Sequence, residues 1–135
     1  MITRSSAYAR EAMLQALADM VDAAERPGMI NIFGGGQPGS ADESPGDRPL
    51  LAKLTFAKPA FGRPAGGVIG ARATAESEAL AAGKPTWARI SDGDGNAVVD
   101  LDVGEEGKPL NLSTVTFERG GRIEILSLVL RMPAA

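Results

Sequence analysis

The sequence predicts a mainly β fold, an antiparallel sandwich or jelly roll of about seven or eight strands with an N-terminal amphipathic helix. Three observations predict this class: a helical apolar period confined to the start of the chain, short apolar segments after it, and turn residues throughout. The 135 residues include 17 Gly and 9 Pro and have the length of one domain. We divide the chain into a helical arm, residues 1–27, and a β-sandwich domain, residues 28–135.

The first 26 residues form the predicted helix. Its apolar stripe, with Leu14 beside it, consists of Met13, Leu17, Met20, Val21 and Ala24. Ser5 or Ser6 can cap the start, because a serine side chain accepts a hydrogen bond from the first turn. Arg26-Pro27-Gly28 ends the helix, because proline disfavours helical backbone in the residue before it. The stripe can pack on a sheet face, cover a sheet edge or contact a neighbouring subunit.

The middle of the chain carries three predicted strands and two predicted loops. Met29 to Phe33 is a strand, and a loop rich in glycine and proline runs from Gly34 to Pro49. Leu50 to Phe56 alternates apolar and other residues, which indicates a half-buried strand. Gly67 to Ala73 is a third strand, and the small residues from Thr74 to Pro85 predict a loop or a helical turn.

The C-terminal part contains a predicted hairpin and further strands. Thr86 to Ser91 and Asn96 to Val103 flank two Asp-Gly pairs, which are strong hairpin signals. Alternation places Ala97, Val99, Leu101 and Val103 inward, and Val98, Asp100 and Asp102 outward. Leu110 to Phe117 supplies one or two more strands, and Arg122 to Met132 supplies the last. The apolar phase changes within that last strand, which predicts a bulge or burial of both faces.

The composition excludes several kinds of chemistry. The chain has no Cys and no His, so it cannot form a thiolate nucleophile, a Ser-His-Asp triad or a zinc finger. A net charge of −3 lacks the basic excess that is typical of nucleic-acid binders. No apolar run reaches the ~18 residues of a membrane helix. We therefore expect no enzyme activity, no cofactor and no metal, and neither nucleic acid nor membrane as a partner.

Two motifs have the spacing of ligand sites but lack a required part. The run GGGQPG from Gly34 matches the dinucleotide-binding fingerprint, yet prolines follow where a helix must begin. Asp92, Asp94 and Asn96 have the spacing that begins a calcium loop, but the later glycine and glutamate of that loop are missing. A tight hairpin explains these three residues.

Two further features have a structural explanation beside a functional one. Asp100 and Asp102 lie on one face of a predicted strand, as the carboxylates of a glycoside hydrolase could, but alternating outward acids are typical of half-exposed strands. Trp87, the single tryptophan, is expected to be a core or interface anchor; if it is exposed, it could stack on a ligand.

Several segments resemble a family of small tailed-bacteriophage virion proteins with a similar "LATLTF…PAFG…GGV" core. The similarity lies in LLAKLTFAKPAFG at Leu50–Gly62, in Ala65–Val68, in Thr86–Ile90, in Asp94–Gly104 and in Leu110–Leu112. These are packing and turn residues without a catalytic signature. The resemblance implies a virion structural protein, made in the host cytoplasm and placed on the capsid surface as a decoration or cement protein that stabilises contacts between major capsid subunits.

The partners that this resemblance implies are the major capsid protein and copies of the chain itself, as a homo-oligomer. The expected interface residues are Met13, Leu17, Met20, Val21, Gly34, Gly35, Gly36, Trp87, Val129 and Arg131. Two alternatives stay open. The chain could be a tail, connector or tail-tip subunit, or it could be a host-surface carbohydrate-binding module that uses exposed Trp87 or Tyr8 and the acidic stretch 92–106.

Overall fold

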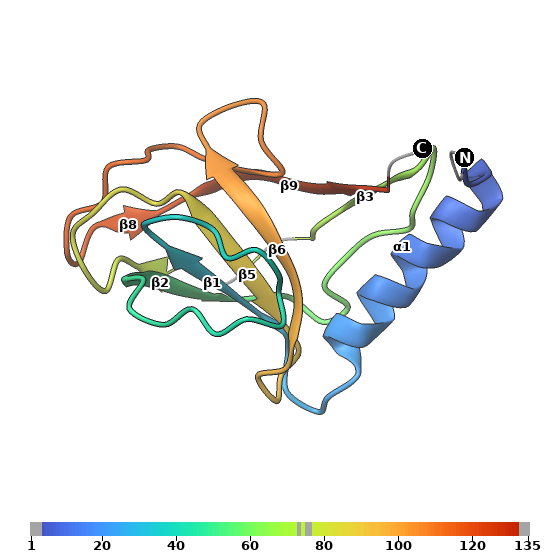
Figure 1. Ribbon diagram of the computed structural model, residues 1–135, viewed down its shortest axis with the longest axis horizontal. Coiled ribbons are helices and arrows are strands. Elements are labelled where there is room, and N and C mark those ends of the chain that lie inside the picture. The colour runs from blue at the N-terminus through green and yellow to red at the C-terminus, as the bar shows by residue number, and fades with distance from the viewer. Residues whose placement is uncertain (1–3, 73, 75–76, 133–135) are drawn as a thin grey trace.

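The computed structural model, which describes residues 4–72, 74 and 77–132, has one helix and nine strands in its described part and confirms the mainly β class (Figure 1). The helix is α1 (Ala7–Asp22). The strands are β1 (Met29–Phe33), β2 (Leu50–Thr55), β3 (Val68–Gly70), β4 (Ser77–Glu78), β5 (Trp87–Ser91), β6 (Ala97–Gly104), β7 (Leu110–Leu112), β8 (Arg122–Ile123) and β9 (Ile125–Arg131). Segments predicted over residues 1–3, 73 and 75–76 lie outside the described residues.

Seven of the strands form one sheet, in the order β2-β1-β5-β6-β7-β9-β3, and β4 pairs with β8. All of these pairs are antiparallel except β6 with β7, so the sheet is mixed where the sequence predicted an antiparallel one. The strand number also exceeds the prediction. The expected last strand is divided at Glu124 into β8 and β9, and β4 lies in a segment predicted as a loop or a helical turn.

The described residues between Val68 and Leu80 connect the two edges of the seven-stranded sheet. This segment pairs with β9 through β3 and with β8 through β4. On its other side, Phe56 at the end of β2 forms a bridge with Thr74, and the Leu80 N–H donates to the Leu51 carbonyl at 2.8 Å. The sheet therefore curls around a single cluster of buried apolar side chains, to which α1 also contributes.

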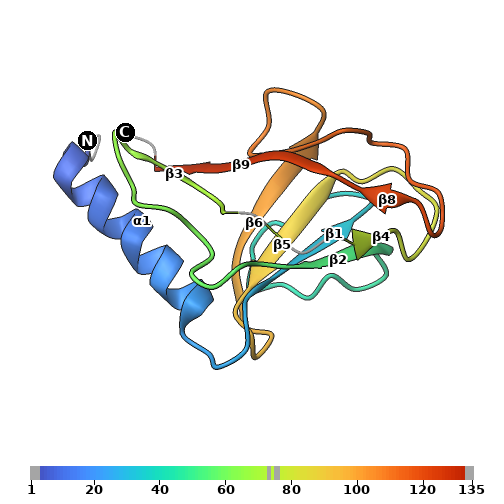
Figure 2. The ribbon, with the colours of Figure 1, turned by 180° about the vertical axis from the view of Figure 1, so that it is seen from behind.

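The buried face of α1 differs from the predicted one. Leu14 and Val21 are 1 % and 0 % exposed, and Ala18 lies buried between them, whereas Met13 and Met20 are 46 % and 56 % exposed. The helix packs against β3 and β6, where these two strands lie apart (Figure 2). Large apolar side chains occur on both flanks of the helix, Met13 and Met20 on one and Leu14 on the other. The apolar period alone therefore could not fix the rotation of the helix about its axis, and it placed Leu14 beside the stripe.

The ends of α1 follow local signals. Ser6 is the N-cap, and its Oγ accepts a hydrogen bond from the Ala9 N–H at 3.1 Å, as predicted. The helix ends at Asp22, four residues before the predicted end. The backbone at Gly28 lies close to both α1 and β5. A Cβ there would contact the Val21 side chain and would lie 2.8 Å from the Ser91 carbonyl oxygen, so this position favours glycine.

The predicted hairpin is present as β5 and β6, which pair antiparallel from Trp87–Asp102 to Ser91–Ala97. Leu101 and Val103 are buried as expected, but Val99 is half-buried and Ala97 is exposed. This difference has a structural cause. The ladder between β6 and β7 joins only Val103 and Gly104 to β7, so the first part of β6 has a partner in β5 but none on its other side.

Candidate functional site

The aspartates of the β5–β6 hairpin serve its turn. Asp92 Oδ1 accepts hydrogen bonds from the N–H groups of Asp94 and Asn96, both at 2.9 Å, and Oδ2 accepts one from Asn96 Nδ2 at 3.0 Å. These bonds, first of all the one from the Asn96 side chain, hold the pKa of Asp92 below its usual value. Within the described residues no group of three or more His, Cys, Asp or Glu could hold a metal ion.

Trp87 is a core residue. Its side chain is fully buried, its ring stacks on Phe33 with centroids 4.4 Å apart, and the Arg89 guanidinium lies 5.5 Å from the ring centroid. The indole Nε1–H donates to the Gly34 carbonyl at 3.1 Å. Trp87 is therefore a core anchor, as expected, and the alternative of an exposed Trp87 that stacks on a sugar is wrong, because other groups of this chain cover both the ring and its polar edge.

Asp100 forms a buried ion pair on the same side of the sheet. Arg89 Nε and Nη2 donate to its two carboxylate oxygens at 2.7 and 3.0 Å, and both side chains are nearly inaccessible. The hydrogen bond to Asp100 raises the pKa of Arg89 above its usual value, so the guanidinium stays charged. Both carboxylate oxygens of Asp100 accept hydrogen bonds from Arg89, so Asp100 and the exposed Asp102 do not form a pair of free carboxylates.

Residues 34–49 form a loop, as predicted. The loop covers the outer side of the sheet over Trp87 and the Arg89–Asp100 pair. The Thr86 hydroxyl donates to the Gly35 carbonyl, and Arg48 Nε donates to the Gly36 carbonyl. No helix begins in this loop, so the GGGQPG run lacks the structure of a dinucleotide site. Gly34 is buried, while Gly35 and Gly36 are exposed.

A groove of about 690 Å³ lies where β6 and β9 diverge. In Figure 1 the two strands approach each other near the end of β6 and separate toward α1. Residues 97–102 of β6 have a ladder partner only in β5. On the other wall, the Val129 N–H donates to the Pro109 carbonyl at 2.9 Å. After Val129, residues 130 and 131 of β9 pair only with β3. The walls are thus two strand edges with unpaired backbone groups.

Both signs of charge line this groove, which we call the β6–β9 groove. Asp102 is on the β6 wall, Arg131 is on the β9 wall, and Lys108 lies in the β6–β7 connection beside Gly104, all three exposed. Asn111 connects the backbone at Lys108 to β9, because its Nδ2 donates to the Lys108 carbonyl at 2.9 Å and to Ser127 Oγ at 3.0 Å. This arrangement of mixed charge and free strand edges can bind an extended polypeptide.

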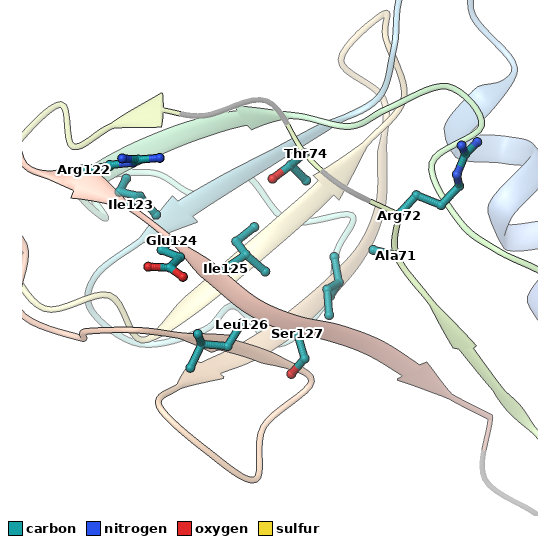
Figure 3. A pocket seen from close by; sticks show the side chains of 10 residues that line it. Ala71, Arg72, Thr74, Arg122, Ile123, Glu124, Ile125, Leu126 and Ser127 are labelled. Carbon is teal, nitrogen blue, oxygen red and sulfur yellow. The ribbon is translucent and has the colours of Figure 1, made fainter.

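A second hollow, of about 330 Å³, lies between β9 and the residues Ala71, Arg72 and Thr74 (Figure 3). Ile125 and Leu128 line it, and Leu126 at its rim is 58 % exposed. Arg72 and Arg122 lie at opposite ends of the hollow in Figure 3 and do not converge on a common ligand position.

The expected interface residues fall into three places. Val129 and Arg131 line the β6–β9 groove, and Gln37 of the 34–49 loop lines it too. Gly34, Gly35 and Gly36 belong to the 34–49 loop, and Trp87 lies buried beneath it. On α1, Val21 and the half-buried Leu17 pack against the core, whereas Met13 and Met20 stay exposed. Sequence reasoning missed Lys108 and Gln37 because no local pattern connects them to β9.

Comparison with known proteins found no match to a family model, to a curated protein or to a solved structure. Among the described residues, no helix is long and apolar enough to cross a membrane. The fold and its surfaces therefore carry the functional argument.

Proposed function

We propose that this chain is a virion structural protein that decorates a bacteriophage capsid and stabilises contacts between major capsid subunits. The observation that carries the proposal is the β6–β9 groove, whose walls are strand edges without a ladder partner on that side. Exposed edges bind further strands through main-chain hydrogen bonds, and this mode of binding needs no catalytic residue. The occupant that we propose is an extended segment of a capsid subunit.

The charges in the groove support a protein segment as its occupant. Asp102 lines the groove from β6, Arg131 lines it from β9, and Lys108 lines it from the β6–β7 connection. An extended segment presents alternate side chains to its two flanks, so it can place a basic residue near Asp102 and an acidic one near Arg131. The sequence resemblance to small virion proteins supports the same class of function.

The test is the copy number and position of the protein in purified particles, by quantitative mass spectrometry and cryo-electron microscopy. We expect many copies over the head, in a fixed ratio to the major capsid protein. A single ring of copies at the tail or neck would support the connector alternative instead. Absence from purified particles would reject a virion role.

A matched pair of variants tests the groove. Asp102→Lys reverses a charge inside it, and Asp94→Lys makes the same change on the exposed hairpin turn. We expect Asp102→Lys to lower the number of particle-bound copies, since it removes the attraction for a basic residue of the occupant. Asp94→Lys should leave that number unchanged. Equal binding of both variants would exclude the groove as the contact.

A further inference from the structure

The β6–β9 groove continues the line of β7, and we call this line the β7 row. Leu110 of β7 pairs with Val103 of β6 on one side and with Leu128 of β9 on the other, so one strand fills the space between the walls at this level. The backbone leaves the row at Lys108, whose N–H donates to Asn111 Oδ1 at 3.1 Å and whose carbonyl accepts from Asn111 Nδ2 at 2.9 Å. Beyond that point the described residues place no strand between the walls, although the row begins with the width of one strand.

The backbone on both walls can bind a segment in this row. Successive residues of a strand direct their N–H and C=O groups alternately to its two neighbours. In β6, the Val103 N–H donates to a carbonyl on the β5 side at 3.1 Å, so the groups of Asp102 and Asp100 point into the row. In β9, the Met132 N–H donates to a carbonyl on the β3 side at 3.1 Å, so the groups of Arg131 point into the row from the other wall. Because β6 and β9 run in opposite directions, an inserted strand is antiparallel to one of them whichever way it runs.

The side chains along the row define what the inserted strand should carry. Two residues back from the start of β7, the row lies between Leu101 and Leu130, which are 4 % and 7 % exposed. An apolar side chain at this position extends the core. One residue further back, the row lies between Asp100 and Arg131, and the inserted side chain points outward. Arg89 neutralises Asp100 and Arg131 is exposed, so an uncharged polar or an acidic side chain suits this position.

We propose that an extended segment of a capsid subunit enters the β7 row as a short strand, paired with β6 on one side and with β9 on the other. One apolar side chain of this strand contacts Leu101 and Leu130, and the next side chain, a polar one, points outward. The walls separate toward α1 (Figure 1), so beyond these positions the strand follows β6, whose free edge extends to Ala97. Main-chain hydrogen bonds give such an added strand its affinity, and alternate side chains give it specificity. The inference deepens the proposed function and rests on it for the source of the segment.

A peptide probe tests the pairing on the full, isotope-labelled chain by nuclear magnetic resonance. The probe is acetyl-Lys-Val-Thr-Val-Lys-amide, whose valines alternate with polar residues and whose sequence reads the same in both directions. We expect a dissociation constant on the order of 1 mM, because so short a segment makes few contacts. At about 10 mM probe, the unoccupied fraction falls to about one tenth, so solvent exchange of the Asp100 and Arg131 amides should slow about tenfold. The Leu101 and Leu130 amides point to β5 and β3 instead and should not slow.

Two matched controls separate main-chain pairing from other contacts. The same peptide with methylated nitrogens at its valines and threonine keeps the side chains but loses main-chain donors, so it should not slow exchange. In the protein, Arg131→Pro removes an N–H that points into the row, whereas Arg131→Ala removes only a side chain. Followed at the Asp100 amide, Arg131→Pro should bind the probe about threefold or more weakly than Arg131→Ala. Circular dichroism checks that both variants are folded.

The outcomes distinguish this inference from the proposed function. No slowing at the highest probe concentration, or equal slowing by the methylated peptide, would overturn the pairing even if the protein is found on particles. Slowing caused by a higher protein concentration alone would place a second copy in the row and overturn the assignment to a capsid segment. Probe binding by a protein that is absent from purified particles would reject the capsid role and support strand pairing in the groove.

Discussion

The rotation of α1 about its axis can be tested by comparing two adjacent residues. Leu14 is buried in the core and Met13 is exposed, although the apolar period of the sequence favoured Met13 as the inward residue. Leu14→Ala removes three buried carbon atoms, which costs about 2 kcal/mol at about 0.8 kcal/mol per methylene. The cavity left behind raises the loss of unfolding free energy to about 2–5 kcal/mol. Met13→Ala should change it by no more than about 0.5 kcal/mol.

Urea unfolding, followed by circular dichroism, measures both variants. Each is measured at two protein concentrations, so that any contribution from self-association shows as a concentration dependence of the midpoint. A loss below about 1 kcal/mol for Leu14→Ala, or equal losses for the two variants, would refute the packing of Leu14 against the core.

Three further predictions concern the backbone, the buried ion pair and the hairpin. Gly28→Ala should lower the unfolding free energy by about 1–3 kcal/mol, because the added methyl group meets α1 and a β5 carbonyl. Gly39→Ala is the control: its methyl group enters open space, so it should be neutral in the same urea titration. Arg89→Met leaves the buried Asp100 carboxylate without its partner and should lower the unfolding free energy by about 3–5 kcal/mol. Adding Asp100→Leu to this variant should recover part of the lost unfolding free energy. A double-mutant cycle that shows no recovery would contradict the buried pair. The lowered pKa of Asp92 contributes stability above its unfolded pKa that is lost as the pH falls through the folded value. Asp92→Asn should therefore flatten the acid side of the stability–pH curve, and an unchanged slope would argue against these hydrogen bonds.

Local signals explain the parts of the fold that the sequence predicted well. Ser6 caps α1 with its own side chain, and β1 occupies Met29–Phe33 as expected. The Asp-Gly pairs mark the turn of the hairpin, because Asp92 binds backbone groups within four residues of itself. Each of these interactions joins residues close in sequence, so a short window of sequence contains all of its determinants.

The parts that the sequence could not predict depend on distant residues. The parallel β6–β7 pair and the β4–β8 pair join segments whose order in the sheet no apolar period specifies. The β6–β9 groove follows from that order, because β7 is too short to separate β6 from β9 along their whole length. A site formed by missing strand pairing leaves no motif in either strand.

The 34–49 loop shows how a chain with few large apolar residues gains a second layer over its sheet. The loop contributes backbone carbonyls, and Trp87, Thr86 and Arg48 donate to the three consecutive glycines from Gly34. These bonds satisfy the polar edge of the buried indole and help to hold the loop over the stacked Trp87 and Phe33 rings. The first of the glycines that resembled a dinucleotide-binding motif thus has a structural use: a Cβ on Gly34 would lie 3.1 Å from the Lys84 carbonyl oxygen and 3.3 Å from Pro49 Cγ, so the missing side chain lets the chain pass close to these residues.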